Sequence, residues 1–331
     1  MKFYKVNITL LTIFLLFNLD ANQTTGYEQR PEVIDFIKMM HTKHGLDRKK
    51  LIELFSGVIF QERVVRIMNK QPEGTLTWSK YKRMMISEDR INSGKKFIRS
   101  YRKDLERAEE IYGVPIEIIA SIIGIETKYG KIMGNTRVLD SLSTLSFDYP
   151  RRSKFFKIQL EEFLLLAEEE ALDPSKIKGS IAGAMGYGQF MPDSYRNYAV
   201  DFDFDGKRDI LDNPVDAIGS VANFLNKKGK WEPNTKVAIK AKLVAERPIL
   251  KSSFSPYIIV SDLDSIGINP AYKLHSSLEV VPIELELDEG YEYWLGLKNY
   301  QALSRYNRSK LYIMAVFEFS ESLSKIYNFE R

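Results

Sequence analysis

The stretch PIEIIASIIGIETKYG, residues 115–130, places a glutamate where a helix is expected to be apolar. Isoleucines recur in it at three- and four-residue spacing, which predicts a helix with one buried face. Glu126 follows Ile122 by four residues and Ile123 by three, so it continues the apolar stripe. A carboxylate on a buried face is costly unless it is paired, protonated or used in chemistry. The stretch therefore predicts a core helix that presents a functional acid and ends near Gly130.

Composition restricts what the rest of the chain can do. The 331 residues are 44% hydrophobic and 28% charged, enough for one large core or two modest ones. The formal net charge of +4 is too weak and scattered to indicate nucleic-acid binding, although an anionic polymer remains compatible with it. The absence of cysteine excludes disulfides, thiol catalysis, cysteine–zinc sites and acylation at a lipoprotein cysteine.

The first residues have the pattern of a secretory signal peptide. Lys2 and Lys5 precede an apolar run at residues 8–19, and the chain turns polar after Ala21. The run is too short to span a bilayer comfortably. We expect a signal peptide at residues 1–21 and export, with an uncleaved N-terminal anchor as the alternative.

Hydrophobic periodicity divides the chain into a helical and a strand-forming part. Residues 31–229 show mostly helical spacing, including one long stretch at 78–113, and Asp47 is a plausible N-cap. Residues 233–300 change to period two, as in KVAIKAKLV and PIELEL. The chain ends on an amphipathic helix. We predict a mainly α protein with a small antiparallel β subdomain and a returning C-terminal helix.

Two segments after Glu126 are candidates for ligand contacts. YPRR at 149–152 puts two guanidinium groups, Arg151 and Arg152, beside an aromatic ring, where they are suited to carboxylates; a solvated helix start is equally compatible. GSIAGAMGYGQFMP at 179–192 combines dense glycines with polar side chains and matches no nucleotide-binding loop. We interpret it as a loop that lines a ligand.

DFDFDGKRDILD at 201–212 matches the spacing of a twelve-residue calcium loop. Its glycine falls at the sixth position, where such loops turn sharply. Two departures are an aspartate at position twelve, which should weaken coordination, and an arginine at position eight. We predict a structural calcium site rather than an acidic solvated turn. Its expected ligands are Asp201, Asp203, Asp205, Lys207 (through its carbonyl), Asp209 and Asp212.

Together these segments resemble the lytic murein transglycosylase B family of bacterial cell-wall enzymes. The resemblance lies in residues 122–156, 179–206, 213–225 and 294–307 and spans about residues 30–320. It implies a lysozyme-like core. We therefore divide the chain into a signal peptide (1–21), an N-terminal helical region (28–105), a catalytic core with the calcium loop (106–232), a β subdomain (233–300) and a C-terminal segment (301–331).

The resemblance also implies the chemistry. Glu126 would be the single acid and base that cleaves the bond between N-acetylmuramic acid and N-acetylglucosamine, giving 1,6-anhydromuramoyl ends without water. Arg151 and Arg152 would meet the anionic stem peptide. An apolar site fits this role, because desolvation raises a carboxyl pKa. The residues implied to contact the sugars or the intermediate are Ser180, Tyr187, Gln189, Tyr306, Asn307 and Tyr312.

We expect no organic cofactor and no nucleic-acid partner. We expect a periplasmic monomer whose partners are peptidoglycan strands with their stem peptides, together with proteins of wall synthesis or division. Asp140 and Asp148 are nearby acids, but their positions beside a helix and a proline turn favour capping over catalysis. A hydrolytic muramidase and a non-catalytic wall-binding scaffold stay open as alternatives.

Overall fold

The structure is a computed structural model that describes residues 26–69 and 76–327. The predicted signal peptide lies outside the described residues. The chain forms two compact units, Met1–Ser56 and Gly57–Arg331. In the part of the chain that the structure describes, no helix is both long and apolar enough to cross a membrane.

The first unit is a small helical pair. Its elements are η1 (Tyr27–Gln29), α1 (Pro31–His44) and α2 (Arg48–Ser56). Gly45, at φ 74°, ends α1. The Asp47 carboxylate accepts the N–H groups of Lys49 and Lys50 at 2.7 and 3.0 Å, which confirms the predicted N-cap of α2.

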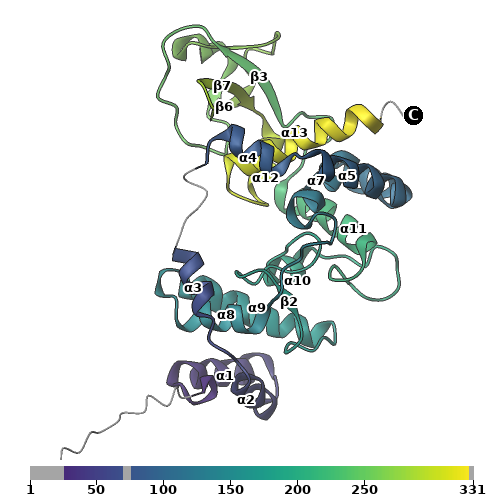
Figure 1. Cartoon of the computed structure of the whole chain (residues 1–331), viewed down its shortest axis with the longest axis vertical. Coiled ribbons are helices and arrows are strands. Elements are labelled where there is room, and N and C mark those ends of the chain that lie inside the picture. Colours follow the sequence, from purple (N-terminus) through teal and green to yellow (C-terminus); the bar gives the residue numbers. More distant parts are fainter. Residues whose placement is uncertain (1–25, 70–75, 328–331) are drawn as a thin grey trace, which may run out of the picture. The chain divides into compact units, whose positions relative to one another are not determined.

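Helices make up most of the second unit (Figure 1). The stretch at 78–113 forms three helices instead of one, because Ser87 caps a new helix by accepting the Arg90 N–H and a further break follows at Tyr101. The helical elements before the large sheet are α3 (Glu62–Asn69), α4 (Trp78–Met85), α5 (Glu88–Ser100), α6 (Arg102–Tyr112), α7 (Ile116–Thr127), α8 (Val138–Phe147), η3 (Pro150–Arg152), α9 (Ser153–Glu169), α10 (Pro192–Tyr198), α11 (Pro214–Phe224) and η4 (Leu225–Gly229).

The period-two region forms the predicted small antiparallel sheet. Its strand order is β4-β6-β7-β3-β5, and a separate two-stranded sheet pairs β1 (Thr136–Arg137) with β2 (Lys178–Gly179). The large sheet packs its own apolar core around Ile268 and Leu295. The elements of this part are β3 (Ala238–Leu243), β4 (Ile258–Ile259), η5 (Val260–Ile266), β5 (Ile268–Pro270), β6 (Glu279–Glu286) and β7 (Tyr291–Gly296).

After the sheet, α12 (Lys298–Ser304) and α13 (Lys310–Tyr327) return to the helices, where α13 contacts α4, α5 and α7 (Figure 1). The fold class is therefore confirmed: a mainly helical protein with a small antiparallel sheet and a returning helix.

Helix α7 is the centre of this arrangement. Every residue from Ile116 to Ile125 except Glu117 is buried, so the helix is enclosed on all sides rather than along one stripe. It packs against α5, α6, α11 and α13. Glu126 lies in the last turn of α7 and is partly exposed, so the buried helix reaches the surface at this residue.

The Tyr129 side chain fills a slot between two helices beyond the end of α7. A Cβ on Gly94 of α5 or on Gly124 of α7 would lie only 2.5 Å from the Tyr129 hydroxyl. The Tyr129 ring also packs against Phe97 at 4.9 Å between centroids. Both glycines are therefore needed for the close approach of this ring to α5 and α7.

We expect Gly94→Ala to lower the free energy of unfolding by about 1–2 kcal/mol through overpacking, although alanine is normally the better helix former. Chemical denaturation measures this. Adding Tyr129→Phe removes the hydroxyl oxygen that lies nearest to the new Cβ, and it should recover most of the lost stability. The control Asn92→Ala, at an exposed position of the same helix, should leave stability unchanged or slightly raised. A Gly94→Ala variant as stable as the parent would contradict the tight fit.

Candidate active site

Glu126 receives a hydrogen bond from the returning helix. The Tyr312 hydroxyl of α13 donates to Glu126 Oε1 at 2.6 Å, across 186 residues of chain. Desolvation by the surrounding apolar helices raises the pKa of the Glu126 carboxyl to about 7, and the Tyr312 hydrogen bond opposes this rise. The geometry therefore gives a carboxyl group that holds its proton close to neutral pH.

A second tyrosine supports the first. The rings of Tyr306 and Tyr312 stack with centroids 6.5 Å apart and an angle of 8° between their planes. The Tyr306 hydroxyl donates to the Gly188 carbonyl, which ties α12 to the glycine-rich loop. Burial, together with the nearby Glu126 charge, raises the pKa of both tyrosines well above the ordinary value. Both therefore act near neutral pH only as neutral hydrogen-bonding groups.

The chain leaves α7 through three consecutive left-handed residues, Lys128, Tyr129 and Gly130, with φ of 49°, 60° and 83°. Two of them are not glycine, which makes this turn strained. Thr127, which is fully buried, holds it. The Thr127 hydroxyl accepts the Gly130 N–H at 3.0 Å and lies 3.0 Å from the Tyr187 carbonyl. A single threonine carries no such signal in the sequence, so this role of Thr127 could not be predicted.

The predicted ligand-lining loop wraps around the end of α7. The Ser180 hydroxyl accepts the N–H groups of Ala182 and Ala184, and the Gln189 amide donates to the carbonyls of Met133 and Gly186. A Cβ on Gly130 would lie 2.4 Å from the Tyr187 ring, so that ring packs directly on the turn after Glu126. Ser180, Gln189 and Tyr187 therefore help to fix the conformation of this loop.

The remaining predicted ligand contacts lie on other elements. Asn307 follows α12, where its N–H donates to the Leu303 carbonyl, and comes just before Tyr312 along the chain. Arg151 and Arg152 form the turn η3 before α9. Both are exposed, and the Arg152 guanidinium stacks 4.3 Å from the centre of the Phe155 ring. Within residues 26–69 and 76–327, no hydrogen bond or ion pair joins either arginine to Glu126 or the tyrosines.

The nearby acids have other partners. Asp140 lies in the first turn of α8 and is 4% exposed; its carboxylate accepts the Ile59 N–H at 3.0 Å and pairs with Arg137 at 2.6 Å. Asp148 lies at the C-terminal end of α8. Burial and the Tyr312 hydrogen bond account for the raised pKa of Glu126, so neither acid is needed to explain it. Glu126 therefore has no carboxylate partner among the described residues.

The predicted calcium loop forms a sharp turn at Gly206, with φ of 92°. Carboxylate oxygens of Asp201, Asp203 and Asp205 lie within 4.8 Å of one another. This convergence of oxygens fits a hard cation. The other three predicted ligands do not join that carboxylate group: Lys207 would offer its carbonyl, Asp209 accepts the N–H groups of Leu211 and Asp212, and Asp212 is exposed.

Two residues fasten this loop to the protein. Arg208, the unusual residue at position eight, donates to Glu170, the residue just after α9, at 2.7 Å and to the Arg196 carbonyl at 3.0 Å. Asp216 of α11 is fully buried and accepts the N–H groups of Phe202 and Asp209 at 2.6 and 2.7 Å. Burial raises the pKa of Asp216, and those N–H bonds lower it. Little in the sequence indicated this role for Asp216, because an acid in the first turn of a helix is common.

Comparison with known proteins identifies the family to which the chain belongs. Residues 28–321 match the family described as the transglycosylase SLT domain. The chain belongs to that family. It is 42% identical to the membrane-bound lytic murein transglycosylase B of Escherichia coli over 90% of this chain and 84% of that protein. The resemblance found in the motifs is thereby confirmed, and with it the assignment to an enzyme class, the lytic transglycosylases.

Two solved structures of family members are similar over most of their length. One is the Escherichia coli lytic transglycosylase Slt35 in complex with calcium, with a TM-score of 0.83 and 43% identity over 90% of this chain and 94% of that one. The other is SltB3 of Pseudomonas aeruginosa in complex with NAG-anhNAM-pentapeptide, with a TM-score of 0.74 and 30% identity over 88% of this chain and 78% of that one.

The raised pKa of Glu126 predicts a stability effect with a definite sign. Below pH 4.5 the carboxyl is protonated in both states, whereas between pH 4.5 and 7 the unfolded chain ionises and the folded one does not. Stability therefore falls as pH rises through this window. Glu126→Gln removes the titration, and we expect the variant to exceed the parent by up to about 3 kcal/mol at pH 7 and to equal it at pH 4.

Urea unfolding across pH 4 to 7 measures this difference. Glu284→Gln is the control of opposite sign, because a hydrogen bond from Arg247 lowers the pKa of the Glu284 carboxyl. That variant should lose stability relative to the parent at neutral pH. Parallel pH profiles for Glu126→Gln and the parent would show that burial does not raise the pKa of Glu126.

Proposed function

We propose that this chain is a peptidoglycan lytic transglycosylase in which Glu126 alone serves as acid and base. It would cleave the β-1,4 bond between N-acetylmuramic acid and N-acetylglucosamine and leave 1,6-anhydromuramoyl ends. The observation that carries the proposal is the partly buried Glu126 carboxyl, with a pKa of about 7 and a hydrogen bond from Tyr312. The family and the names of its relatives support the substrate.

In the first step, the protonated Glu126 carboxyl gives its proton to the glycosidic oxygen, and the C1–O bond to the leaving N-acetylglucosamine breaks. The electron pair of that bond goes to the leaving oxygen. The positive charge at C1 is stabilised by the N-acetyl oxygen of the muramic acid residue itself. A pKa near the working pH suits this step, because a useful fraction of the carboxyl is protonated while the acid stays strong enough to donate.

In the second step, the ionised Glu126 takes the proton of the muramyl C6 hydroxyl. The C6 oxygen attacks C1 and closes the anhydro ring, so Glu126 regains its proton and no water is consumed. Ordinary glycosidases use two carboxylates for these roles. Here Asp140 is engaged with Arg137 and with the backbone of Ile59, which supports a mechanism with one acid.

The predicted site residues can be assigned to the parts of the substrate that they would contact. We assign the sugar contacts to side chains of the glycine-rich loop and of the α12–α13 region, and the stem-peptide contacts to Arg151 and Arg152, whose exposed guanidinium groups suit carboxylates. The SltB3 complex with a disaccharide pentapeptide supports a ligand of this kind. The residues assigned to the sugars and the intermediate are Ser180, Tyr187, Gln189, Tyr306, Asn307 and Tyr312.

We also propose that the loop at 201–212 binds calcium in a structural role. Asp201, Asp203 and Asp205 would supply carboxylate oxygens, with Asp209, Asp212 and the Lys207 carbonyl completing the set after the loop adjusts. The calcium complex of Slt35 supports the choice of cation. A bound cation would offset the repulsion among the loop carboxylates.

For localisation we propose export to the periplasm through the segment 1–21, with an uncleaved anchor as the alternative form. The chain has no cysteine for lipid attachment. In the periplasm the protein would act as a monomer on glycan strands, alongside proteins of wall synthesis or division.

Calcium should raise the thermal midpoint of the protein by several degrees at saturating concentration, because a ligand that binds only the folded state stabilises it. Asp203→Asn with Asp205→Asn should abolish this shift while keeping the loop's hydrogen-bond acceptors. The control Asp262→Asn with Asp264→Asn removes the same charge outside the loop. That variant should keep the thermal shift on calcium addition. Differential scanning fluorimetry with calcium and with magnesium makes the measurement. A parent protein insensitive to calcium would count against the site.

Glu126→Gln should reduce the release of soluble muropeptides from peptidoglycan at least about 100-fold, because general acid–base catalysis typically contributes 10²–10⁴. Binding to peptidoglycan in a pull-down should stay near the parent level. Mass spectrometry of the parent's products should show anhydro ends, one water lighter than reducing ends. Reducing ends would instead indicate a hydrolytic muramidase, and a parent that binds without cleaving would indicate a scaffold.

A further inference from the structure

A groove lies between the segment 247–254, which connects β3 to β4, and strand β6. We call it the β6 groove. Its main hollow also borders α12 and the start of α13 and has a volume of about 300 Å³. A second hollow of about 410 Å³ adjoins it, and the two share Leu250 and Glu284 as lining residues. The shared residues make the two hollows one continuous groove along this segment.

The β6 groove is separate from the Glu126 site, although both use α13. Lys310, the first residue of α13, lines the groove, and its ammonium group donates to the Glu284 carbonyl of β6 at 2.8 Å. Tyr312, which donates to Glu126, follows two residues later and so points about 200° further around the helix axis. The first turn of α13 therefore contributes to the catalytic cluster on one side and to the groove on the other.

Positive charge is in excess around the β6 groove. Lys251 and Lys310 line it, and both are exposed. The guanidinium group of Arg308, which lies over an aromatic ring of the wall, adds a third positive charge. Glu284 is the carboxylate of the lining, and Arg247 donates two hydrogen bonds of 2.8 Å to it. Because Arg247 balances Glu284, the other three cations favour an anionic ligand.

The wall below these charges is apolar and aromatic. The Phe254 ring stacks on the Tyr300 ring, with centroids 6.3 Å apart and 18° between the planes. Tyr300 and Ile283 are buried, whereas Phe254 and Leu250 are only partly buried, so they keep apolar surface available to a ligand. Such a wall suits small apolar groups, and the rim above it suits a negative charge.

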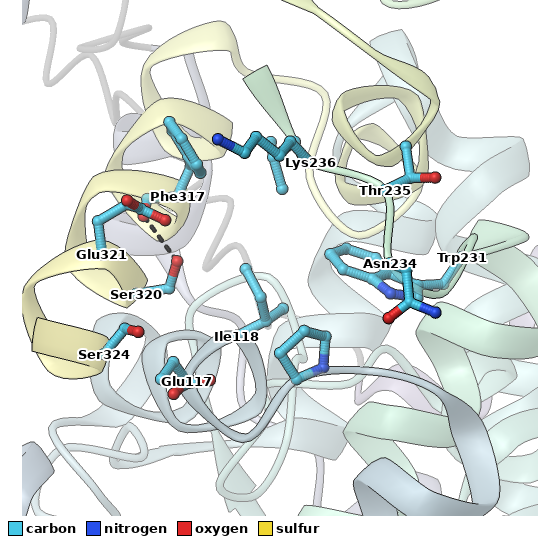
Figure 2. Close-up of a pocket in the computed structure, with 12 residues that line it drawn as sticks. Glu117, Ile118, Trp231, Asn234, Thr235, Lys236, Phe317, Ser320, Glu321 and Ser324 are labelled. Carbon is cyan, nitrogen blue, oxygen red and sulfur yellow. Dashed lines mark hydrogen bonds between the residues drawn. The ribbon is translucent and has the colours of Figure 1, made fainter. Parts of the chain in front are cut away.

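Another hollow of similar size shows the contrast. It lies between α7, α13 and the segment 231–237, and its volume is about 250 Å³ (Figure 2). Its lining includes the carboxylates of Glu117 and Glu321 and the ammonium group of Lys236. Positive charge is therefore not in excess in this second place, which makes Lys236 a suitable control position.

We propose that the β6 groove binds the carboxylate end of a short peptide with small apolar side chains. The carboxylate lies toward Lys251 and Lys310, and the side chains pack on Phe254. The choice of a peptide over other anions rests on the proposed function, because the stem peptides of peptidoglycan end in carboxylates. The SltB3 complex contains a pentapeptide of this kind. The groove is thus a second peptide contact, distinct from Arg151 and Arg152.

Ligand-observed nuclear magnetic resonance tests the groove with N-acetyl-D-alanyl-D-alanine, which has one carboxylate and two methyl side chains. We expect saturable binding with a dissociation constant of about 1 mM or tighter. The C-terminal amide of the same dipeptide lacks the charge and should bind about tenfold more weakly. Inorganic phosphate at equal concentration should not displace the dipeptide. Equal binding of the amide, or displacement by phosphate, would overturn the assignment to a peptide carboxylate.

Matched charge variants locate the binding site. Lys251→Gln should weaken dipeptide binding about threefold, as expected for one exposed ion pair, and adding Lys310→Gln should bring the loss to about tenfold. Lys236→Gln, in the hollow of Figure 2, and the pair Arg151→Gln with Arg152→Gln should leave binding unchanged. The proposal is overturned if the parent protein does not bind the dipeptide, or if the arginine pair weakens binding as much as the lysine pair does.

Two features keep these outcomes separate from other failures. Lys251 is exposed, so Lys251→Gln remains informative even where Lys310→Gln disturbs the contact with β6. Binding of the dipeptide also requires no turnover. A protein that binds it without cleaving peptidoglycan would overturn only the proposed reaction, and one that cleaves peptidoglycan without binding the dipeptide would overturn only the groove.

Discussion

The hydrogen bond from Tyr312 to Glu126 is the contact on which the site depends. It links the last turn of α7 to the start of α13, and these two segments are 186 residues apart. The sheet and α12 lie between them in the chain, so the sheet region must fold back before the pair can form. The C-terminal helix therefore completes the site as well as packing on the core, since without it the Glu126 carboxyl would lose its only hydrogen-bond partner among the described residues.

A second constraint is the way α7 ends. Three successive left-handed residues turn the chain immediately after Glu126 and Thr127, and the Thr127 hydroxyl and the slot between Gly94 and Gly124 hold that turn. The turn leaves Glu126 at the C-terminal end of the helix, where the dipole disfavours a negative charge. Burial acts in the same direction. Backbone strain is thus located where it keeps the carboxyl in place and supports its protonated form.

Much of the fold could be predicted because periodicity is a local property. Helical spacing before residue 230, alternation after it, the Asp47 cap and the spacing of the calcium loop were all readable in short windows. What the sequence hid depends on distant partners. Thr127 and Asp216 look ordinary until the Tyr187 carbonyl and the Phe202 N–H are placed beside them. The enclosure of α7 on all sides was equally hidden, because four helices from different parts of the chain produce it.

The role of Tyr312 also depends on a distant partner and could not be read from a short window of sequence. Its position was implied only by family resemblance, and no spacing rule connects it to Glu126. In the structure it shares the site with Tyr306, and burial keeps both phenols protonated well beyond neutral pH. Glu126 is then the group of this cluster whose protonation changes near pH 7. Under the proposed reaction, the proton delivered to the leaving sugar and the proton taken from the C6 hydroxyl must pass through the same carboxyl. In that reaction the tyrosines would contribute orientation, and the substrate would supply the second functional group that an ordinary glycosidase takes from its own chain.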